Sequence, residues 1–140
     1  MAHFLEAESY KKIVESVPIV CVDIILKYRG KYILVKRTNE PLRGRWWIIG
    51  GRQWKNENLK DTAKRKIAEE SGLVPASMRI SGIYEDSYPK SAWGTPQHSV
   101  SIVFEAIVKR YNPILDSQSS DVTLSDKLPK RFLKHYVKFI

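Results

Sequence analysis

The stretch GRQWKNENLKDTAKRKIAEESGL, residues 51–73, decides how this chain folds. Apolar residues recur in it at intervals of four, which predicts an amphipathic helix over residues 58–71. These residues are Leu59, Ala63 and Ile67. Asn58 suits the N-cap of this helix, and Gly72 suits its C-terminal stop. The chain therefore has a central helix with one apolar face that packs against the rest of the protein.

Two adjacent glutamates, Glu69 and Glu70, stand in the last turn of this predicted helix. At about 100° per residue, Glu70 lies beside the apolar stripe and Glu69 lies further round. Carboxylates at the edge where a helix meets the protein body are costly unless a cation compensates them. The cation is either Mg²⁺, which prefers oxygen ligands, or the helix-spaced side chains of Arg65 and Lys66. For an isolated helix, the ion pairs are the simpler explanation.

The residues before the helix favour the metal. The run WWIIG, residues 46–50, predicts a short strand that ends in Gly50, and Gly51 follows directly. Because glycine has no side chain, a backbone carbonyl at this point can approach a ligand closely. Glu57 adds a further carboxylate just before the helix starts.

Taken together, residues 51–73 resemble the Nudix box, Gly-x5-Glu-x7-Arg-Glu-U-x-Glu-Glu-x-Gly-U, in which U is an aliphatic residue. Eight of its nine specified positions are filled at the right spacing. They are Gly51, Glu57, Arg65, Ile67, Glu69, Glu70, Gly72 and Leu73. The resemblance implies the Nudix fold, an α+β domain with a mixed β-sheet sandwiched between α-helices, here as a single domain over residues 1–140. It also implies hydrolysis of a nucleoside diphosphate linked to another group, with Mg²⁺ or Mn²⁺ as the cofactor.

The same resemblance implies roles for individual residues. The metal ligands would be Glu69, Glu70 and the Gly50 carbonyl. Arg65 would orient the glutamates, and Glu57 would be a supporting carboxylate. The unfilled position is Lys66, where the family usually has a metal-binding glutamate. Replacing a carboxylate by an ammonium changes the local charge by two units, which favours a single metal ion over several.

A narrower resemblance is to the GDP-mannose mannosyl hydrolase subgroup, and it rests on VPIVCVDIIL (residues 17–26) and LVKRTNEPLRGRWWIIGGRQWKNENL (residues 34–59). That subgroup also departs from the box at the position of Lys66, binds one Mg²⁺ and attacks the sugar carbon. The matching positions here are Asp23, Arg37, Arg52, Arg65 and Glu70, with Gln118 as a third side-chain ligand. The resemblance implies a nucleotide sugar such as GDP-mannose as the substrate. The catalytic set would be Arg52, Arg65, Glu69 and Glu70.

Several substrate-binding residues have a structural alternative. Asp23 alternates with apolar residues on one face of a predicted strand, so it either binds substrate or makes a structural hydrogen bond. Arg37 and Arg52 either bind the diphosphate, which suits the arginine fork, or are surface charges. Trp93 and Tyr88 belong to a predicted loop, where they would stack on a nucleobase.

The general base is unassigned. In the subgroup it is a histidine just after the glutamine that Gln118 resembles, and here that place reads Ser119-Ser120. A serine does not act as a base at neutral pH without its own activator. The carboxylates left open for this role are Asp86, Asp116 and Asp121. The missing base and Lys66 together motivate an alternative, a Nudix-fold nucleotide-binding protein with weak or no turnover.

Apolar patterns predict the remaining elements. We expect a helix over residues 7–17 ended by Pro18, a hairpin of strands 19–27 and 31–37, and strands 78–85 and 98–110. Adjacent Trp46 and Trp47 point to opposite faces of their strand, so at least one belongs to the core. Residues 112–126 read as a long polar loop. Helical spacing of Phe132, Leu133, Tyr136, Val137 and Ile140 predicts a C-terminal helix.

Composition limits the class of protein. The single cysteine excludes an internal disulfide, and no apolar run is long enough for a membrane span, so we expect a cytoplasmic protein without membrane contact. The net charge of +9 favours polyanionic partners. A nucleoside-diphosphate derivative is the expected partner, and an RNA or dinucleotide pyrophosphohydrolase is the weaker alternative. A homodimer is left open.

Overall fold

The computed structural model describes residues 5–114 and 119–139 of the chain. In chain order the elements are α1 (Ala7–Ser16), β1 (Ile19–Tyr28), β2 (Lys31–Arg37), β3 (Trp46–Trp47), β4 (Ile49–Arg52), α2 (Leu59–Ser71), β5 (Ser77–Tyr88), β6 (Gln97–Ile107), β7 (Ser119–Ser125), α3 (Lys130–His135) and β8 (Tyr136–Lys138).

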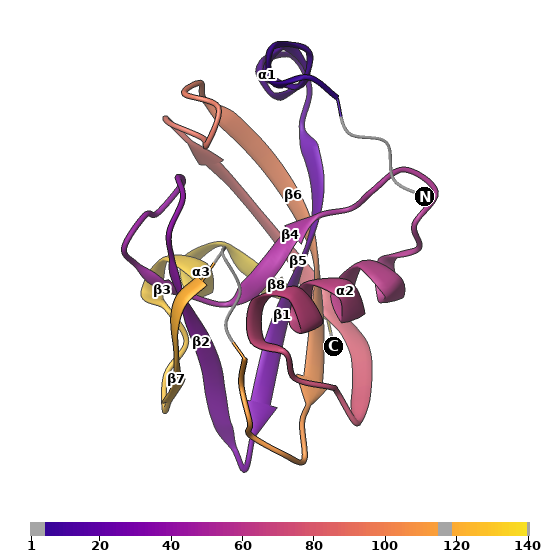
Figure 1. Cartoon of the computed structure of the whole chain (residues 1–140), viewed down its shortest axis with the longest axis vertical. Coiled ribbons are helices and arrows are strands. Elements are labelled where there is room, and N and C mark those ends of the chain that lie inside the picture. The colour runs from indigo at the N-terminus through magenta and orange to yellow at the C-terminus, as the bar shows by residue number, and fades with distance from the viewer. Residues whose placement is uncertain (1–4, 115–118, 140) are drawn as a thin grey trace.

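The strands form one mixed sheet at the centre of the molecule (Figure 1). The order is β3-β2-β1-β6-β5-β8, with β1 and β6 parallel and the other pairs antiparallel. The predicted mixed sheet is therefore confirmed. β1 and β2 pair only beside their turn, at Lys27–Tyr32 and Tyr28–Lys31. Further along, β4 pairs with β1 and places Gly50 opposite Asp23.

The central helix α2 forms where the sequence predicts it. The Asn58 side chain accepts a hydrogen bond from the Asp61 N–H, which caps the first turn. Gly72 ends the helix in the left-handed conformation, at φ 70°, where a side chain would be strained. These local interactions fix which side chains of α2 face the sheet.

Two apolar clusters cover the two faces of the sheet. On one face Ala63 and Ile67 of α2 pack on β1 residues Val22, Ile24 and Leu26. On the other face Phe132 of α3 packs with the alternate β1 residue Ile25 and with Trp47 and Tyr84. The predicted sandwich of a sheet between helices is thus confirmed. Trp47 is buried whereas its neighbour Trp46 is 37% exposed, as the strand alternation predicts.

Three expectations about the elements are wrong. The predicted loop over residues 112–126 contains β7, which pairs with β2. The C-terminal helix ends at His135, and the chain continues as β8, which pairs with β5. WWIIG is split, because β3 pairs with β2 whereas β4 pairs with β1. In each case the pairing partner is distant in sequence, and that long-range contact overrides the local apolar spacing.

Helix α1 stands at one end of the sheet, as Figure 1 shows, and buries only Val14 among its own residues. Within residues 5–114 and 119–139, no helix combines the length and the apolar character that crossing a membrane requires.

Candidate active site

Arg65 organises the charged groups where α2 meets the loop after β4. Its Nε and Nη2 donate to the two carboxylate oxygens of Glu57, at 2.8 Å and 3.0 Å, and Nη2 also donates to the Arg52 carbonyl at 3.0 Å. Nη1 lies 3.3 Å from Glu69 Oε1. The guanidinium stacks on Trp54, 3.6 Å from the ring centroid. Arg65 therefore holds the loop, Glu57 and Glu69 in one arrangement.

Glu57 is a fixed anion in this network. Hydrogen bonds from Arg65 lower its pKa from 4.5 to about 2, and the Thr62 hydroxyl and the Trp54 N–H add to the effect. The role expected of Glu57, a supporting carboxylate, fits these contacts, because Glu57 supports Arg65 and the start of α2.

The two glutamates of the motif have different surroundings. Glu70 is buried, at 4% exposed, and its Oε2 accepts the Gly50 N–H at 3.0 Å. Glu69 is more exposed, with 32% of its side chain accessible, and pairs with Arg65 and with Lys66. The helix-spaced ion pairs considered from sequence are thus present at Glu69, whereas Glu70 faces the glycine turn.

Lys66 is buried between α2 and β4. Its side chain is 8% exposed, and its Nζ lies 3.1 Å from Glu69 Oε2. Its aliphatic stem crosses Gly51, where an added Cβ would meet Lys66 Cε at 2.6 Å. The glycine therefore makes room for the lysine, and the ammonium takes the place of the glutamate that completes the usual motif.

The residues expected to bind metal are of a type that suits a hard divalent cation. Glu69, Glu70 and the Gly50 carbonyl supply oxygen, the ligand type that Mg²⁺ and Mn²⁺ prefer. Among the described residues, no three Asp, Glu, His or Cys side chains converge on one point. Gln118 lies outside the described residues.

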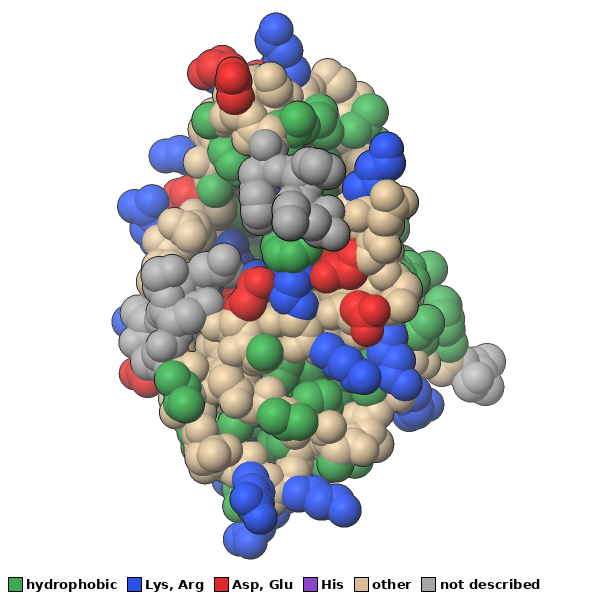
Figure 2. All heavy atoms as spheres, turned by 45° about the vertical axis from the view of Figure 1, so that its right-hand side comes forward, with side chains coloured by type: hydrophobic (Ala, Val, Ile, Leu, Met, Phe, Trp, Pro, Cys, Tyr) green, Lys and Arg blue, Asp and Glu red, His purple; other side chains and the backbone are tan. Residues whose placement is uncertain are grey.

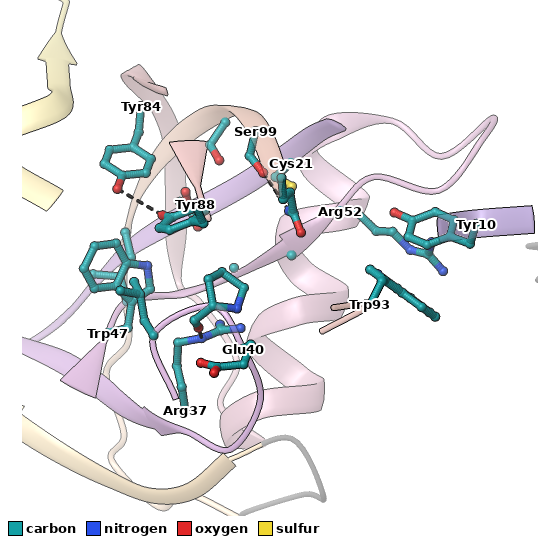
Figure 3. Close-up of a pocket in the computed structure, with 18 residues that line it drawn as sticks. Tyr10, Cys21, Arg37, Glu40, Trp47, Arg52, Tyr84, Tyr88, Trp93 and Ser99 are labelled. Carbon is teal, nitrogen blue, oxygen red and sulfur yellow. Dashed lines mark hydrogen bonds between the residues drawn. The ribbon is translucent and has the colours of Figure 1, made fainter. Parts of the chain in front are cut away.

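A pocket of about 280 Å³ opens on the other side of β4 (Figure 3). Its wall is aromatic and polar. The aromatic residues are Tyr10, Trp47, Tyr84, Tyr88 and Trp93, and polar ones include Asp23, Arg37, Arg52, Ser99 and Ser101. Figure 3 shows Trp47, Tyr84 and Tyr88 at one end and Tyr10, Trp93 and Arg52 at the other. Gly50 and Gly51 belong to the wall.

Asp23 faces this pocket from β1 and is 8% exposed. Burial raises its pKa from 3.8 to about 6, although a hydrogen bond from Ser101 and the charge of Arg37 oppose the shift. Its Oδ1 lies so near Gly50 that a Cβ there would overlap it. A carboxylate with a raised pKa in a pocket wall is typical of a functional site.

The arginines and Trp93 expected at the substrate also line the pocket. Arg37 Nε donates to the Pro41 carbonyl at 2.6 Å. The Arg52 guanidinium lies over the Tyr10 ring, 4.1 Å from its centroid. Trp93 packs on Tyr10, with ring centroids 4.8 Å apart. The structure thus places Asp23, Arg37, Arg52 and Trp93 in the wall of one pocket, and their binding to substrate stays a prediction.

The sequence reasoning missed several wall residues or misplaced them. Tyr10, Cys21 and Tyr84 were assigned no role in the site, and alternation along β1 was the available indication for Cys21 beside Asp23. The loop expected at Tyr88 is wrong, because Tyr88 ends β5 and is buried, at 8% exposed. Asp86, one of the candidate bases, accepts hydrogen bonds from the Tyr84 hydroxyl and from Arg131.

Figure 2 turns the side of α2 towards the viewer. Acidic and basic side chains lie next to one another across the middle of this face. The mixture agrees with the ion pairs of Arg65 and Lys66 with Glu57 and Glu69.

Comparisons with known proteins agree on one fold and one family. The NUDIX domain model matches residues 17–128. The low-salt glycan biosynthesis protein Agl8 of Haloferax volcanii is 33% identical over 134 residues, which are 94% of this chain and 85% of that protein. An ADP-ribose pyrophosphatase of Methanocaldococcus jannaschii is 35% identical over 62% of this chain and 49% of its own length.

Solved structures share the fold. The NUDIX domain of Shewanella oneidensis NrtR, complexed with ADP ribose, superposes with a TM-score of 0.69 at 25% identity and covers 94% of both chains. A MutT protein from Methanosarcina mazei has a TM-score of 0.67 at 20% identity, over 85% of this chain and 90% of its own.

Proposed function

This chain belongs to the Nudix family of hydrolases, and from that premise we propose that it hydrolyses a nucleotide sugar, GDP-mannose or a close analogue, with Mg²⁺ or Mn²⁺. The single observation that carries the proposal is the two-ended pocket, whose wall includes Gly50, the residue that Glu70 contacts. One end offers Tyr10 and Trp93 for stacking on a base, and the other offers Asp23 and hydroxyl groups for a sugar.

The diphosphate fits between the two ends. Arg37 and Arg52 both line the pocket, Arg52 beside Tyr10, and both can form charge-assisted hydrogen bonds with phosphate oxygens. Lys66 adds a fixed positive charge behind Gly51. Arg65 keeps Glu69 and the Arg52 backbone in place. These groups bind and orient the leaving group before any bond breaks.

A divalent ion held by Glu69, Glu70 and the Gly50 carbonyl would neutralise the charge that develops on the departing diphosphate. Asp23 would stabilise positive charge on the sugar carbon from within the pocket, because a carboxylate with a pKa of about 6 is mostly ionised at neutral pH.

Two relatives support this substrate class by their names. One acts in glycan biosynthesis, and nucleotide sugars are the activated form in which sugars enter glycans. The other is an ADP-ribose pyrophosphatase, whose substrate is likewise a nucleoside diphosphate joined to a sugar.

Product analysis in ¹⁸O-labelled water tests the proposal. GDP-mannose, ADP-ribose, a dinucleoside polyphosphate and a nucleoside triphosphate are each incubated with the protein and Mg²⁺ or Mn²⁺. Label in the sugar shows attack at carbon, and label in a phosphate shows attack at phosphorus. The proposal is lost if no nucleotide sugar is cleaved with either ion.

A second candidate is a nucleotide-binding protein without turnover. The observation behind it is the pairing of Lys66 with Glu69, which places an ammonium beside a proposed metal ligand. Calorimetry that shows metal-independent nucleotide binding without product would favour it. Any turnover that depends on Glu70 would exclude it.

A further inference from the structure

A series of hydrogen-bonded side chains connects α3 to the end of the pocket that contains Asp23. The Tyr84 hydroxyl donates to Asp86 Oδ2 at 2.5 Å, and the Tyr88 oxygen lies 3.1 Å from the Tyr84 oxygen. Arg131 of α3 holds Asp86 through Nε at 2.8 Å and Nη2 at 3.1 Å. The series therefore runs Arg131, Asp86, Tyr84, Tyr88 and ends at the pocket wall.

Asp86 is the fixed end of this series. Although burial opposes ionisation, the hydrogen bonds from Arg131, Tyr84 and the Ser87 N–H hold the pKa of its carboxyl below the ordinary value. An ionised carboxylate accepts hydrogen bonds and donates none. The Tyr84 proton must therefore point at Asp86.

This fixed proton sets the direction of the next hydrogen bond. A tyrosine hydroxyl has one proton, and that of Tyr84 is already given to Asp86. In the contact between the two tyrosines, Tyr88 is then the donor and Tyr84 the acceptor. The Tyr88 proton is consequently donated to Tyr84 within the pocket wall, so the Tyr88 oxygen can only accept hydrogen bonds from a ligand in the pocket.

The position of Tyr88 is well held. Its side chain lines the pocket beside Tyr84 and Trp47 (Figure 3), and the Arg131 guanidinium lies 4.8 Å from its ring centroid. The charge of Asp23 acts on the Tyr88 hydroxyl, so both acceptors belong to the same end of the pocket.

We propose that Tyr88 is a specificity-determining residue whose oxygen is a fixed hydrogen-bond acceptor for one hydroxyl of the glycosyl group, with its direction imposed by Tyr84, Asp86 and Arg131. The inference rests on the proposed function and adds to it a required donor on the ligand. Tyr84 is a positioning residue, because it acts through Tyr88.

Deoxy and deoxyfluoro analogues test the direction of the bond. Binding of GDP-mannose and of its 2-, 3-, 4- and 6-deoxy and deoxyfluoro forms is measured by calorimetry in the Glu70→Gln background, which suppresses turnover. One deoxy analogue should bind about tenfold more weakly than GDP-mannose, the equivalent of one net hydrogen bond. Its fluoro analogue should be equally weak, because fluorine donates no proton.

Two variants test whether the weaker binding of the deoxy analogue depends on Tyr88 and Tyr84. In Tyr88→Phe the deoxy, fluoro and parent ligands should bind within about twofold of one another, and GDP should bind as before. In Tyr84→Phe the Tyr88 proton loses its acceptor and becomes free to face the ligand, so the fluoro analogue should gain relative to the deoxy one. Tyr111→Phe, in a ring that stacks on Tyr28 and has no part in the pocket wall, is the matched control.

Three results would overturn the inference while the proposed function stands. The fluoro analogue binds better than the deoxy one before Tyr84 is changed, the weaker binding of the deoxy analogue survives Tyr88→Phe, or Tyr88→Phe weakens GDP as much as GDP-mannose. If the native protein cleaves no nucleotide sugar, the proposed function fails and this inference falls with it, before any variant is compared.

Discussion

The two sides of strand β4 hold carboxylates in opposite states. On the α2 side, Arg65 lowers the pKa of Glu57 to about 2. On the pocket side, burial raises the pKa of Asp23 to about 6. A neighbouring cation stabilises the ionised form of a carboxylate, whereas burial destabilises the ionised form, so that the carboxylate is protonated more easily. On the α2 side the carboxylate of Glu57 therefore stays ionised and fixed in position. On the pocket side the protonation of Asp23 can change when a ligand binds.

Among changes on the α2 side, we expect Glu70→Gln to have the largest effect on turnover. The side chain keeps its shape but loses the charge that makes it a proposed metal ligand. We expect turnover to fall by about a thousandfold, since a bound metal contributes several kcal/mol to transition-state stabilisation. Steady-state rates with the substrate found in the ¹⁸O experiment measure the loss.

The control for Glu70→Gln is Glu85→Gln. Glu85 is exposed and pairs with His98 on neighbouring strands, away from β4. Its loss should leave the rate within about twofold, as for an ordinary surface change. Equal rates for Glu70→Gln and the native protein would remove Glu70 from the metal site.

The α2 side was the more predictable of the two, because its residues are close in sequence. Asn58, Gly72 and the spacing of Leu59 and Ile67 are local indications of a helix, and the structure has that helix. The motif selects Glu70 and Gly50 as metal ligands, which stays a prediction, and the hydrogen bond from the Gly50 N–H to Glu70 is what the structure adds. Lys66 is a visible departure from the motif, whereas its passage across Gly51 depends on how α2 packs against β4.

The pocket side could be predicted only in part. Asp23, Arg37 and Arg52 were found by resemblance, and the wall they share with Tyr10 and Tyr84 depends on strands far apart in sequence. β7 was missed for the same reason. Its alternation of Val122 and Leu124 with polar residues is short, and what stabilises it is pairing with β2.

Arg65→Ala is the next largest disturbance of the α2 side. It leaves Glu57 and Glu69 without their shared partner in a site where Arg65 and Glu57 are only 16% and 14% exposed. We expect a loss of about 3 kcal/mol in the free energy of unfolding, as for breaking a buried ion pair. Urea denaturation measures it.

Arg79→Ala is the matched control for Arg65→Ala. Arg79 pairs with Glu105 at 2.7 Å, nearly the same length, but its side chain is 69% exposed. Its loss should cost less than about 0.5 kcal/mol, because water screens the pair. Similar costs for the two variants would show that burial does not distinguish the two ion pairs.

Asp23 and Glu57 should affect the pH dependence of stability in opposite directions. Between pH 3.8 and about 6 the folded protein keeps the Asp23 proton and the unfolded chain loses it, so Asp23 makes stability fall as pH rises through this window. For Glu57 the sign is opposite, and its contribution is present above pH 4.5 and lost towards pH 2.

Asp23→Asn should therefore raise the free energy of unfolding at pH 7 by up to about 3 kcal/mol and leave it nearly unchanged near pH 3.5. Urea denaturation at pH 3.5, 5 and 7 measures this. Glu57→Gln is the opposite case, with its largest loss at pH 7 and its smallest near pH 2. Parallel curves for Asp23→Asn and the native protein would show that Asp23 is not strained by burial.

Lys66→Glu tests whether an ammonium limits this side of β4 to one metal ion. The change restores the full motif and shifts the local charge by two units beside Glu69. The shorter side chain also withdraws from Gly51. We expect Mn²⁺ to bind about tenfold more tightly, or a second ion to bind, since a new oxygen ligand replaces a repelling charge.

The control for this change is Lys64→Glu, which makes the same change of charge on the exposed side of the same helix. Solvent screens a charge at that position, so metal affinity should change by less than about twofold. Calorimetric titration with Mn²⁺ compares both variants with the native protein. If Lys66→Glu and Lys64→Glu shift the titration equally, net charge explains the effect. If the Lys66→Glu and native titrations superimpose, Lys66 does not control the number of ions.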